Sequence, residues 1–231
     1  QGKDKLGQFP AISISNILCF GQVSVSPFLM GFCGEQGIGL SFYTEYGKFL
    51  ARVQGKQTGN VLLRRAQYRW ADDEEKSVAI ARLFVAAKIA NGRSIMMREV
   101  RNHGDNPALS HAIKKLANSL RRIQYAQEVS ESMGIEGDAA NTYFSVFNEL
   151  LRGTGFTFNG RVRRPPTDPV NALLSFAYTL ITHECSSALQ GVGLDPYVGF
   201  LHQDRPGRVS LALDLLEEFR APWADRFVLT L

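Results

Sequence analysis

The stretch DDEEKSVAIARLFVAAKI, from Asp72 to Ile89, decides the fold. From Lys76 onward its apolar residues recur at helical spacing, and Asp72 or Asp73 is available as the N-cap. Upstream the pattern is that of strands, and downstream it stays helical. The change of period therefore predicts an α+β protein, with a small N-terminal β-strand domain at residues 1–70 and a larger all-α domain at residues 71–231.

Short runs with turn residues between them define the first domain. Residues 11–15 alternate between apolar and polar, and residues 39–43 and 49–53 are rich in aromatics, so each run predicts a strand. Residues 26–33 predict one short helix. Gly37 would end it, because glycine accepts the left-handed conformation at a helix C-terminus.

Four further helices follow the first one in the second domain. Asn106 and Pro107 open one, and Asp168 and Pro169 open another that ends at Gly191. A helix from about residue 135 to 151 lies between them. Ser210 is a plausible N-cap for a last helix, which runs through Phe219.

Composition excludes several classes of protein. With 45% hydrophobic and 21% charged residues, the chain of 231 residues is typical of a globular protein. No run reaches the ~18 apolar residues that a membrane span needs, and no signal peptide is visible. The widely spaced Cys19, Cys33 and Cys185 form no CxxC pair, which argues against zinc and disulfides and favours a reducing cytoplasm.

Charge and termini add two expectations. Residues 1–70 carry 8 Lys or Arg and 3 Asp or Glu, which weakly favours a polyanionic partner, although such an excess is also an ordinary solvated face. The chain begins without Met and stops inside an apolar run. We therefore expect a protein truncated at both ends, with further C-terminal helices missing.

Glu136 is the first residue that points to chemistry. It shares a predicted helical face with Ala140, Tyr143 and Phe144, which should be buried. An unpaired carboxylate on that face costs several kcal/mol unless it is paired, protonated or bound to a metal. The alternative is a first-turn acid that complements the helix dipole.

His202, Asp214 and Glu217 are further candidates near the C-terminal end. His202 lies between an apolar segment and a polar turn, where it suits a metal ligand, although a lone histidine is more often structural. Asp214 and Glu217 are three apart and share a helix face. Carboxylates beside an imidazole suit Mg²⁺ or Mn²⁺, whereas the alternative is a solvated acidic face.

Arginines accompany these candidates. Arg161, Arg163 and Arg164 precede two prolines, and Arg205 and Arg208 flank the turn after His202. Arginine binds phosphate bidentately, so these side chains favour a phosphodiester substrate. For each cluster taken alone, simple solubility is an adequate explanation.

Four long motifs resemble one family. They are Gly134–Ala140, Arg163–Tyr178, Gly193–His202 and Ser210–Arg220, in that order, and the similarity extends upstream through Gly59–Tyr68. Together they resemble the CRISPR-associated endonuclease and integrase family of the first Cas protein. The motif sequences are most similar to those of its type I-C branch. The likeness covers nearly the whole chain.

The resemblance implies a metal centre and partners. It implies that Glu136, His202 and Glu217 hold Mg²⁺ or Mn²⁺, with Asp214 as a supporting acid in the catalytic group. It implies contacts to DNA from Arg161, Arg163, Arg164, Asn171, Tyr178, Arg205 and Arg208. It further implies a homodimer that works with the second Cas protein, and also with the fourth, on double-stranded DNA with single-stranded ends in the prokaryotic cytoplasm.

The implied activity is insertion of captured spacer DNA into a CRISPR array by phosphodiester strand transfer. Two alternatives stay open. One is a non-catalytic DNA-binding scaffold subunit, in which the acids are structural. The other is a general DNA-repair nuclease that uses the same residues on another substrate. Convergence of Glu136, His202 and Glu217 would favour catalysis over the scaffold.

Overall fold

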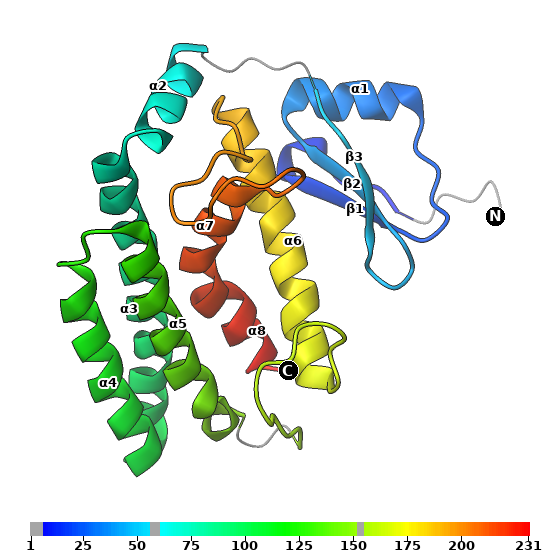
Figure 1. Cartoon of the computed structure of the whole chain (residues 1–231). Coiled ribbons are helices and arrows are strands. Elements are labelled where there is room, and N and C mark those ends of the chain that lie inside the picture. The colour runs from blue at the N-terminus through cyan, green and yellow to red at the C-terminus, as the bar shows by residue number, and fades with distance from the viewer. Residues whose placement is uncertain (1–6, 56–60, 152–154) are drawn as a thin grey trace. The chain divides into compact units, whose positions relative to one another are not determined.

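The computed structural model describes residues 7–55, 61–151 and 155–231. It divides the chain into two compact units, residues 1–59 and residues 60–231 (Figure 1). The predicted α+β class is confirmed: a three-stranded sheet precedes a helical unit. The boundary lies at 59/60 rather than 70/71, because the segment after residue 60 is helical.

The first unit is a β-α-β element with one added strand. It contains η1 (Ala11–Ser13), β1 (Asn16–Phe20), α1 (Pro27–Gln36), β2 (Gly39–Tyr43) and β3 (Phe49–Val53). β1 and β2 run parallel and β3 pairs antiparallel with β2. Gly37 ends α1 with a φ of 69°, as predicted.

One strand prediction was wrong. Residues 11–15 alternate but form no strand; they begin with a 3₁₀ turn, and β1 starts at Asn16. All three residues of the turn are exposed, so no packed sheet face selects an extended conformation there. The predicted strands at 39–43 and 49–53 are confirmed as β2 and β3.

The second unit is built around the long helix α3 (Glu74–His103). The other elements are α2 (Val61–Ala71), α4 (Pro107–Ile123), α5 (Val129–Ser145), η2 (Phe147–Leu150), α6 (Pro169–Gly191), α7 (Ser210–Phe219), η3 (Arg220–Asp225) and α8 (Arg226–Val228). α3 packs against α4 and α5 and also against α7. It is therefore the element that brings these helices together around one core.

Most predicted helix starts are confirmed by their caps. Asp73, Asn106 and Asp168 each accept a hydrogen bond from a backbone N–H in the first turn of α3, α4 and α6. Ser210 is not a cap: its hydroxyl donates to the Gln203 carbonyl oxygen instead. No helix among the described residues is both long and apolar enough to cross a membrane.

The third helix starts earlier than predicted. α5 begins at Val129 and ends at Ser145, so Glu136 lies two turns inside it rather than in its first turn. The alternative interpretation of Glu136, as a first-turn acid that complements the helix dipole, is therefore excluded, because that effect falls off within the first turn. A different reason is needed for a carboxylate at this position.

Met96 tests the core of the second unit. It is fully buried in α3 within the main apolar cluster, whereas the next residue, Met97, is 44% exposed. We expect Met96→Ala to lower the free energy of unfolding by about 2–5 kcal/mol, because it leaves a cavity. Met97→Ala is the matched control and should cost under about 0.5 kcal/mol. Equal losses in chemical denaturation would contradict this packing.

Candidate metal centre

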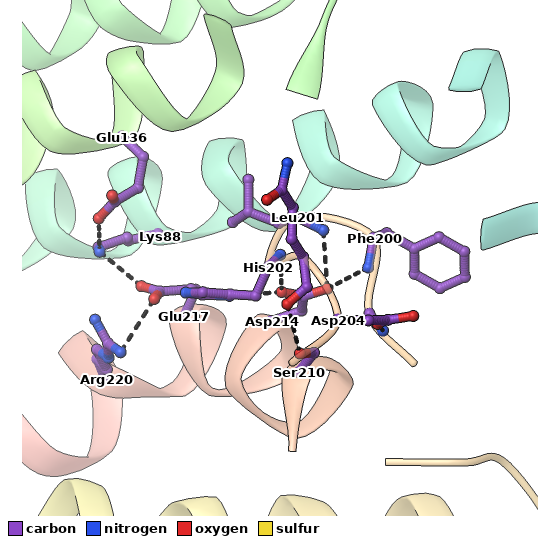
Figure 2. Close-up of polar contacts among 12 residues, drawn as sticks. Lys88, Glu136, Phe200, Leu201, His202, Asp204, Ser210, Asp214, Glu217 and Arg220 are labelled. Atoms are coloured by element: carbon purple, nitrogen blue, oxygen red, sulfur yellow. Dashed lines mark hydrogen bonds and ion pairs between the residues drawn. The ribbon is translucent and has the colours of Figure 1, made fainter. Parts of the chain in front are cut away.

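Glu136 and Glu217 share one cation, Lys88. The Lys88 ammonium pairs with Glu136 Oε1 and lies 2.6 Å from Glu217 Oε2, and Figure 2 shows the three side chains in a row. They come from α3, α5 and α7, which pack together. Two of the three predicted ligands are thus brought to one place by the helical core.

Glu217 is a buried carboxylate held by opposite charges. It is 2% exposed, and Arg220 Nη2 lies 3.0 Å from its Oε1. Burial by itself would raise the pKa of Glu217, but Lys88, then Arg220, and also His202 lower it, and the pKa falls below its ordinary value. Glu217 is therefore ionised at neutral pH.

His202 is oriented by Asp214. The imidazole Nδ1 lies 2.7 Å from Asp214 Oδ1, so the other ring nitrogen, Nε2, remains for a ligand. Asp214 is fully buried and also accepts backbone N–H hydrogen bonds from Phe200, Leu201 and His202. Both of its carboxylate oxygens accept hydrogen bonds from the turn that carries His202 (Figure 2). Asp214 therefore positions the histidine and is not itself a metal ligand.

Gly199 allows this turn to close. A Cβ there would lie 2.8 Å from the His202 carbonyl oxygen, 2.8 Å from Ser210 Cβ and 2.9 Å from Asp214 Oδ2. No larger side chain fits without moving the backbone. The turn that carries His202 therefore requires glycine at position 199.

Gln67 anchors the segment before the histidine turn. Its amide nitrogen donates to the carbonyl oxygens of Asp195 and Val198, and its amide oxygen accepts from the Asp195 N–H, at 2.8–2.9 Å. The side chain is buried. Tyr68 adds a hydrogen bond to the Asp195 carboxylate, and Arg64 one to the Gly193 carbonyl oxygen. The sequence placed these α2 residues in a basic strand region, whereas they form a helix that fixes the loop.

A third buried acid, Asp225, belongs to the same helical segment as Arg220. η3 is a π-helical segment that places both residues. The Tyr178 hydroxyl donates to Asp225, and the Arg220 and Arg161 guanidinium groups lie 5.1 and 5.4 Å from the Tyr178 ring centroid. Burial raises the pKa of Asp225 to about 6, against the opposing effects of Tyr178 and Arg220.

The residues predicted to bind DNA separate into buried and exposed groups. Asn171 is fully buried: it hydrogen-bonds the Gly160 carbonyl oxygen, Asp168, the Val162 N–H and Arg161. The prediction that Asn171 contacts DNA is therefore wrong. Its polar atoms instead hydrogen-bond within the protein and hold the loop that carries Arg161. Tyr178 is half-buried and directs its hydroxyl at Asp225.

The remaining arginines are accessible. Arg163, Arg164 and Arg205 are exposed and Arg208 is half-buried, so their guanidinium groups are open to a ligand. Arg161 is half-buried, and it donates to Asn171 and to Ser175. Burial lowers the pKa of Arg161, which still leaves it charged at neutral pH.

Convergence of the three predicted ligands is partial. In the part of the chain that the structure describes, no three His, Cys, Asp or Glu side chains form a group arranged to hold a metal ion. The donor types nevertheless fit one: two carboxylates face a shared cation, the buried Glu217 Oε2 makes no aligned hydrogen bond, and the histidine is held through Nδ1. A cation already lies where carboxylates from α5 and α7 meet.

Lys88, Arg220, Asp225 and Gln67 were missed by sequence reasoning. Lys88 alone left a signal: it continues the stripe of Ala81 and Val85, both fully buried, at spacings of four and three. A lysine on a buried stripe needs a buried partner. Arg220 pairs with Glu217 one helical turn before it, whereas Gln67 and Asp225 act through contacts with residues far away in the sequence.

Solved structures share this fold. A Cas1 protein from Thermotoga maritima superposes with a TM-score of 0.80 at 27% identity, over 96% of this chain and 68% of that one. A casposase bound to an integration product gives 0.79 at 25%, over 94% and 60%. A Cas6-RT-Cas1–Cas2 complex gives 0.73 at 26%, over 94% and 23%. The architecture is therefore that of the two-unit α+β proteins of the Cas1 type.

The sequence places the chain within that class. The family model described as CRISPR associated protein Cas1 matches residues 1–231, and the chain belongs to this family. A relative from Chlorobaculum tepidum named CRISPR-associated endonuclease Cas1 is 52% identical over 97% of this chain and 67% of its own length. A Cas4/Cas1 fusion from Geobacter sulfurreducens is 40% identical over 93% and 40%. The chain spans about two thirds of the first relative.

Gly199 gives a local test of the histidine turn. We expect Gly199→Ala to lower the free energy of unfolding by roughly 2 kcal/mol or more, because a Cβ collides with the backbone and with Asp214. Gly191→Ala is the control, since a Cβ there meets nothing within 4 Å. Thermal unfolding measures both, and an unchanged melting temperature for Gly199→Ala would contradict the turn.

Asp225 gives a pH test. Its pKa rises from 3.8 to about 6 on folding, so between these values the folded state binds more protons than the unfolded state. Its contribution to stability therefore falls as pH rises from about 4 to about 6, by at most ~3 kcal/mol. Asp225→Asn should remove that component, whereas Asp72→Asn, at an exposed site, should not. Parallel stability curves for wild type and Asp225→Asn would contradict the shift.

Proposed function

We propose that this protein is a metal-dependent DNA endonuclease and integrase that inserts captured spacer DNA into a CRISPR array by phosphodiester strand transfer. The observation that carries the proposal is the meeting of the Glu136 and Glu217 carboxylates at one cation, beside a histidine fixed by Asp214. Family membership and the likeness to a casposase bound to an integration product support it.

The second unit would supply the catalytic residues. Glu136, His202 and Glu217 would hold Mg²⁺ or Mn²⁺, which when bound polarises a phosphate oxygen and lowers the barrier to its substitution. Asp214 would keep His202 Nδ1 occupied and so present Nε2 as the ligand. Burial of Glu217 excludes water from the side of the carboxylate that faces the core.

DNA would be held by the accessible arginines. Arg163, Arg164, Arg205 and Arg208 would contact flanking phosphates of double-stranded DNA with single-stranded ends, because arginine forks match phosphate oxygens. Arg161 and Tyr178 would shape the wall behind them, since each is engaged with protein groups. These phosphate contacts predict binding that weakens with salt.

The proposed assembly is a homodimer that works with Cas2, in the prokaryotic cytoplasm. A Cas1–Cas2 complex among the similar structures supports the Cas2 partner, and a relative fused to Cas4 supports Cas4 as a further partner. The sequences of the motifs support assignment of the protein to the type I-C branch. The chain spans about two thirds of the length of the Chlorobaculum tepidum relative. The proposed activity and partners are therefore those of the whole protein to which these residues belong.

A non-catalytic DNA-binding scaffold is the second candidate. The observation that favours it is Lys88, whose ammonium neutralises the two acids, together with the lack of a three-donor group among the described residues. A scaffold needs the arginines but not the acids. The two candidates therefore differ in what loss of one carboxylate does.

Glu136→Gln separates them. In a half-site integration assay with Cas2 and Mn²⁺, we expect this variant to lose strand transfer by about 100-fold or more, because one metal ligand is gone and each 1.4 kcal/mol of barrier is tenfold. Glu131→Gln, an exposed acid on the same helix α5, is the control and should keep activity.

Two outcomes would reject the integrase. Full strand transfer by Glu136→Gln with Mn²⁺ present would favour the scaffold. Cleavage of branched DNA by the wild type, without any joining of ends, would favour a general DNA-repair nuclease. Circular dichroism confirms that each variant is folded.

A further inference from the structure

Lys88 is a charged residue in a structural position. It extends the buried stripe of α3, and its side chain is 13% exposed. Its ammonium touches Glu136 from α5 and Glu217 from α7, residues that lie far from it in sequence (Figure 2). Three helices of the core therefore meet at one lysine nitrogen.

Charge explains why the lysine is needed there. The Glu217 side chain is 3% exposed and the Glu136 side chain 24%, so water screens their mutual repulsion poorly. Lys88 and Arg220 bring two positive charges to these two negative ones, and the cluster is neutral without any metal. Among the described ion pairs, Arg220 is paired with Glu217 and not with Glu136, whereas Lys88 is paired with both acids and so bridges them.

We propose that Lys88 is the built-in counter-ion of the Glu136–Glu217 pair, which a divalent cation must displace in order to bind. The inference rests on the proposed function, since it assumes that these acids receive a metal. Both cations require the same oxygens: the ammonium lies 2.6 Å from Glu217 Oε2, about the length of a metal–ligand bond plus a few tenths of an ångström. They cannot occupy this place together.

Asp225 is the anion that receives the displaced ammonium. Lys88 lines a cavity of ≈ 30 Å³, about the volume of one water in the liquid, together with Tyr178, Arg220 and Asp225. Asp225 is 1% exposed, and the charge of Lys88 already favours its ionised form. A rotation of the flexible lysine side chain toward Asp225 keeps the ammonium paired while it releases Glu136 and Glu217.

This proposal predicts a gain of metal affinity on loss of the lysine. We expect Lys88→Met to bind Mn²⁺ about tenfold or more tightly than wild type, because the competing cation is gone while both carboxylates remain. Lys76→Met is the matched control: it removes one charge from the same helix, at an exposed pair with Asp73. Titration calorimetry, or the electron paramagnetic resonance of free Mn²⁺, measures the affinity without DNA or turnover.

Thermal unfolding gives a second readout. In EDTA, Lys88→Met should melt several degrees below Lys76→Met, because the carboxylates of the buried Glu217 and the partly buried Glu136 then repel one another. Mn²⁺ should raise the melting temperature of Lys88→Met more than that of wild type. If Lys88→Met does not fold in EDTA, Lys88→Met/Glu136→Gln removes the repulsion and should fold. Failure of that double variant to recover would overturn the inference.

The remaining outcomes separate this inference from the proposed function. A Mn²⁺ affinity of folded Lys88→Met equal to or weaker than that of wild type, but still lost in Glu217→Gln, would overturn the counter-ion and leave the metal site intact. Absence of Mn²⁺ binding in wild type and in Lys88→Met alike would overturn the metal site itself, and with it the displacement.

Discussion

The Asp214 carboxylate accepts hydrogen bonds from three consecutive backbone N–H groups and from the His202 ring. A fully buried carboxylate is tolerated only when its oxygens are satisfied, and here the chain that satisfies them is the turn that carries the histidine. The close approach of the Gly199 backbone to Asp214 and the hydrogen bonds of Gln67 to the preceding segment also hold this turn in place. The position of His202 thus follows from the burial of one acid, and the imidazole is fixed before any ligand arrives.

Glu217 lies one helical turn beyond Asp214, and the two acids have opposite surroundings. Asp214 faces backbone N–H groups of its own neighbourhood, whereas Glu217 faces the side-chain cations Lys88 and Arg220. Fixed backbone donors make a rigid support. Side-chain cations make a partner that can be exchanged, because lysine reorients without disturbing the backbone. One face of helix α7 therefore carries two acids: Asp214, which positions the histidine, and Glu217, whose cationic partner can be exchanged.

Much of the fold could be predicted from local signals. Asp73, Asn106 and Asp168 cap helices by contacts within three residues, and Gly37 ends α1 by its own backbone conformation. Two failures arose where local pattern and tertiary packing disagree. Residues 11–15 alternate like a strand without a packed sheet face, and α2 was placed with the strands although Gln67 is fixed by residues more than a hundred positions away.

The site was predictable as a set of acids and a histidine, but not as an electrostatic unit. Long motifs pointed to Glu136, His202 and Glu217, whereas no sequence pattern indicated that Lys88 and Arg220 are the cations that pair with these acids. Lys88 resembles any lysine of an amphipathic helix until α5 and α7 are packed against it. The charge of the cluster therefore exists only in the folded chain, and no single helix encodes it.

The same balance explains how the centre could distinguish its states. Without a metal, the two carboxylates and the two side-chain cations cancel, and under the proposed function these four groups would offer a phosphodiester little net charge. With a divalent cation in place and Lys88 retained nearby at Asp225, the cluster gains about two positive charges, which a DNA phosphate and its neighbour can offset. Attraction of the anionic substrate would then depend on the metal as well as on the surface arginines, because the field at a partly buried site is screened less than at the surface. On this view the lysine keeps the resting centre both stable and unattractive to DNA.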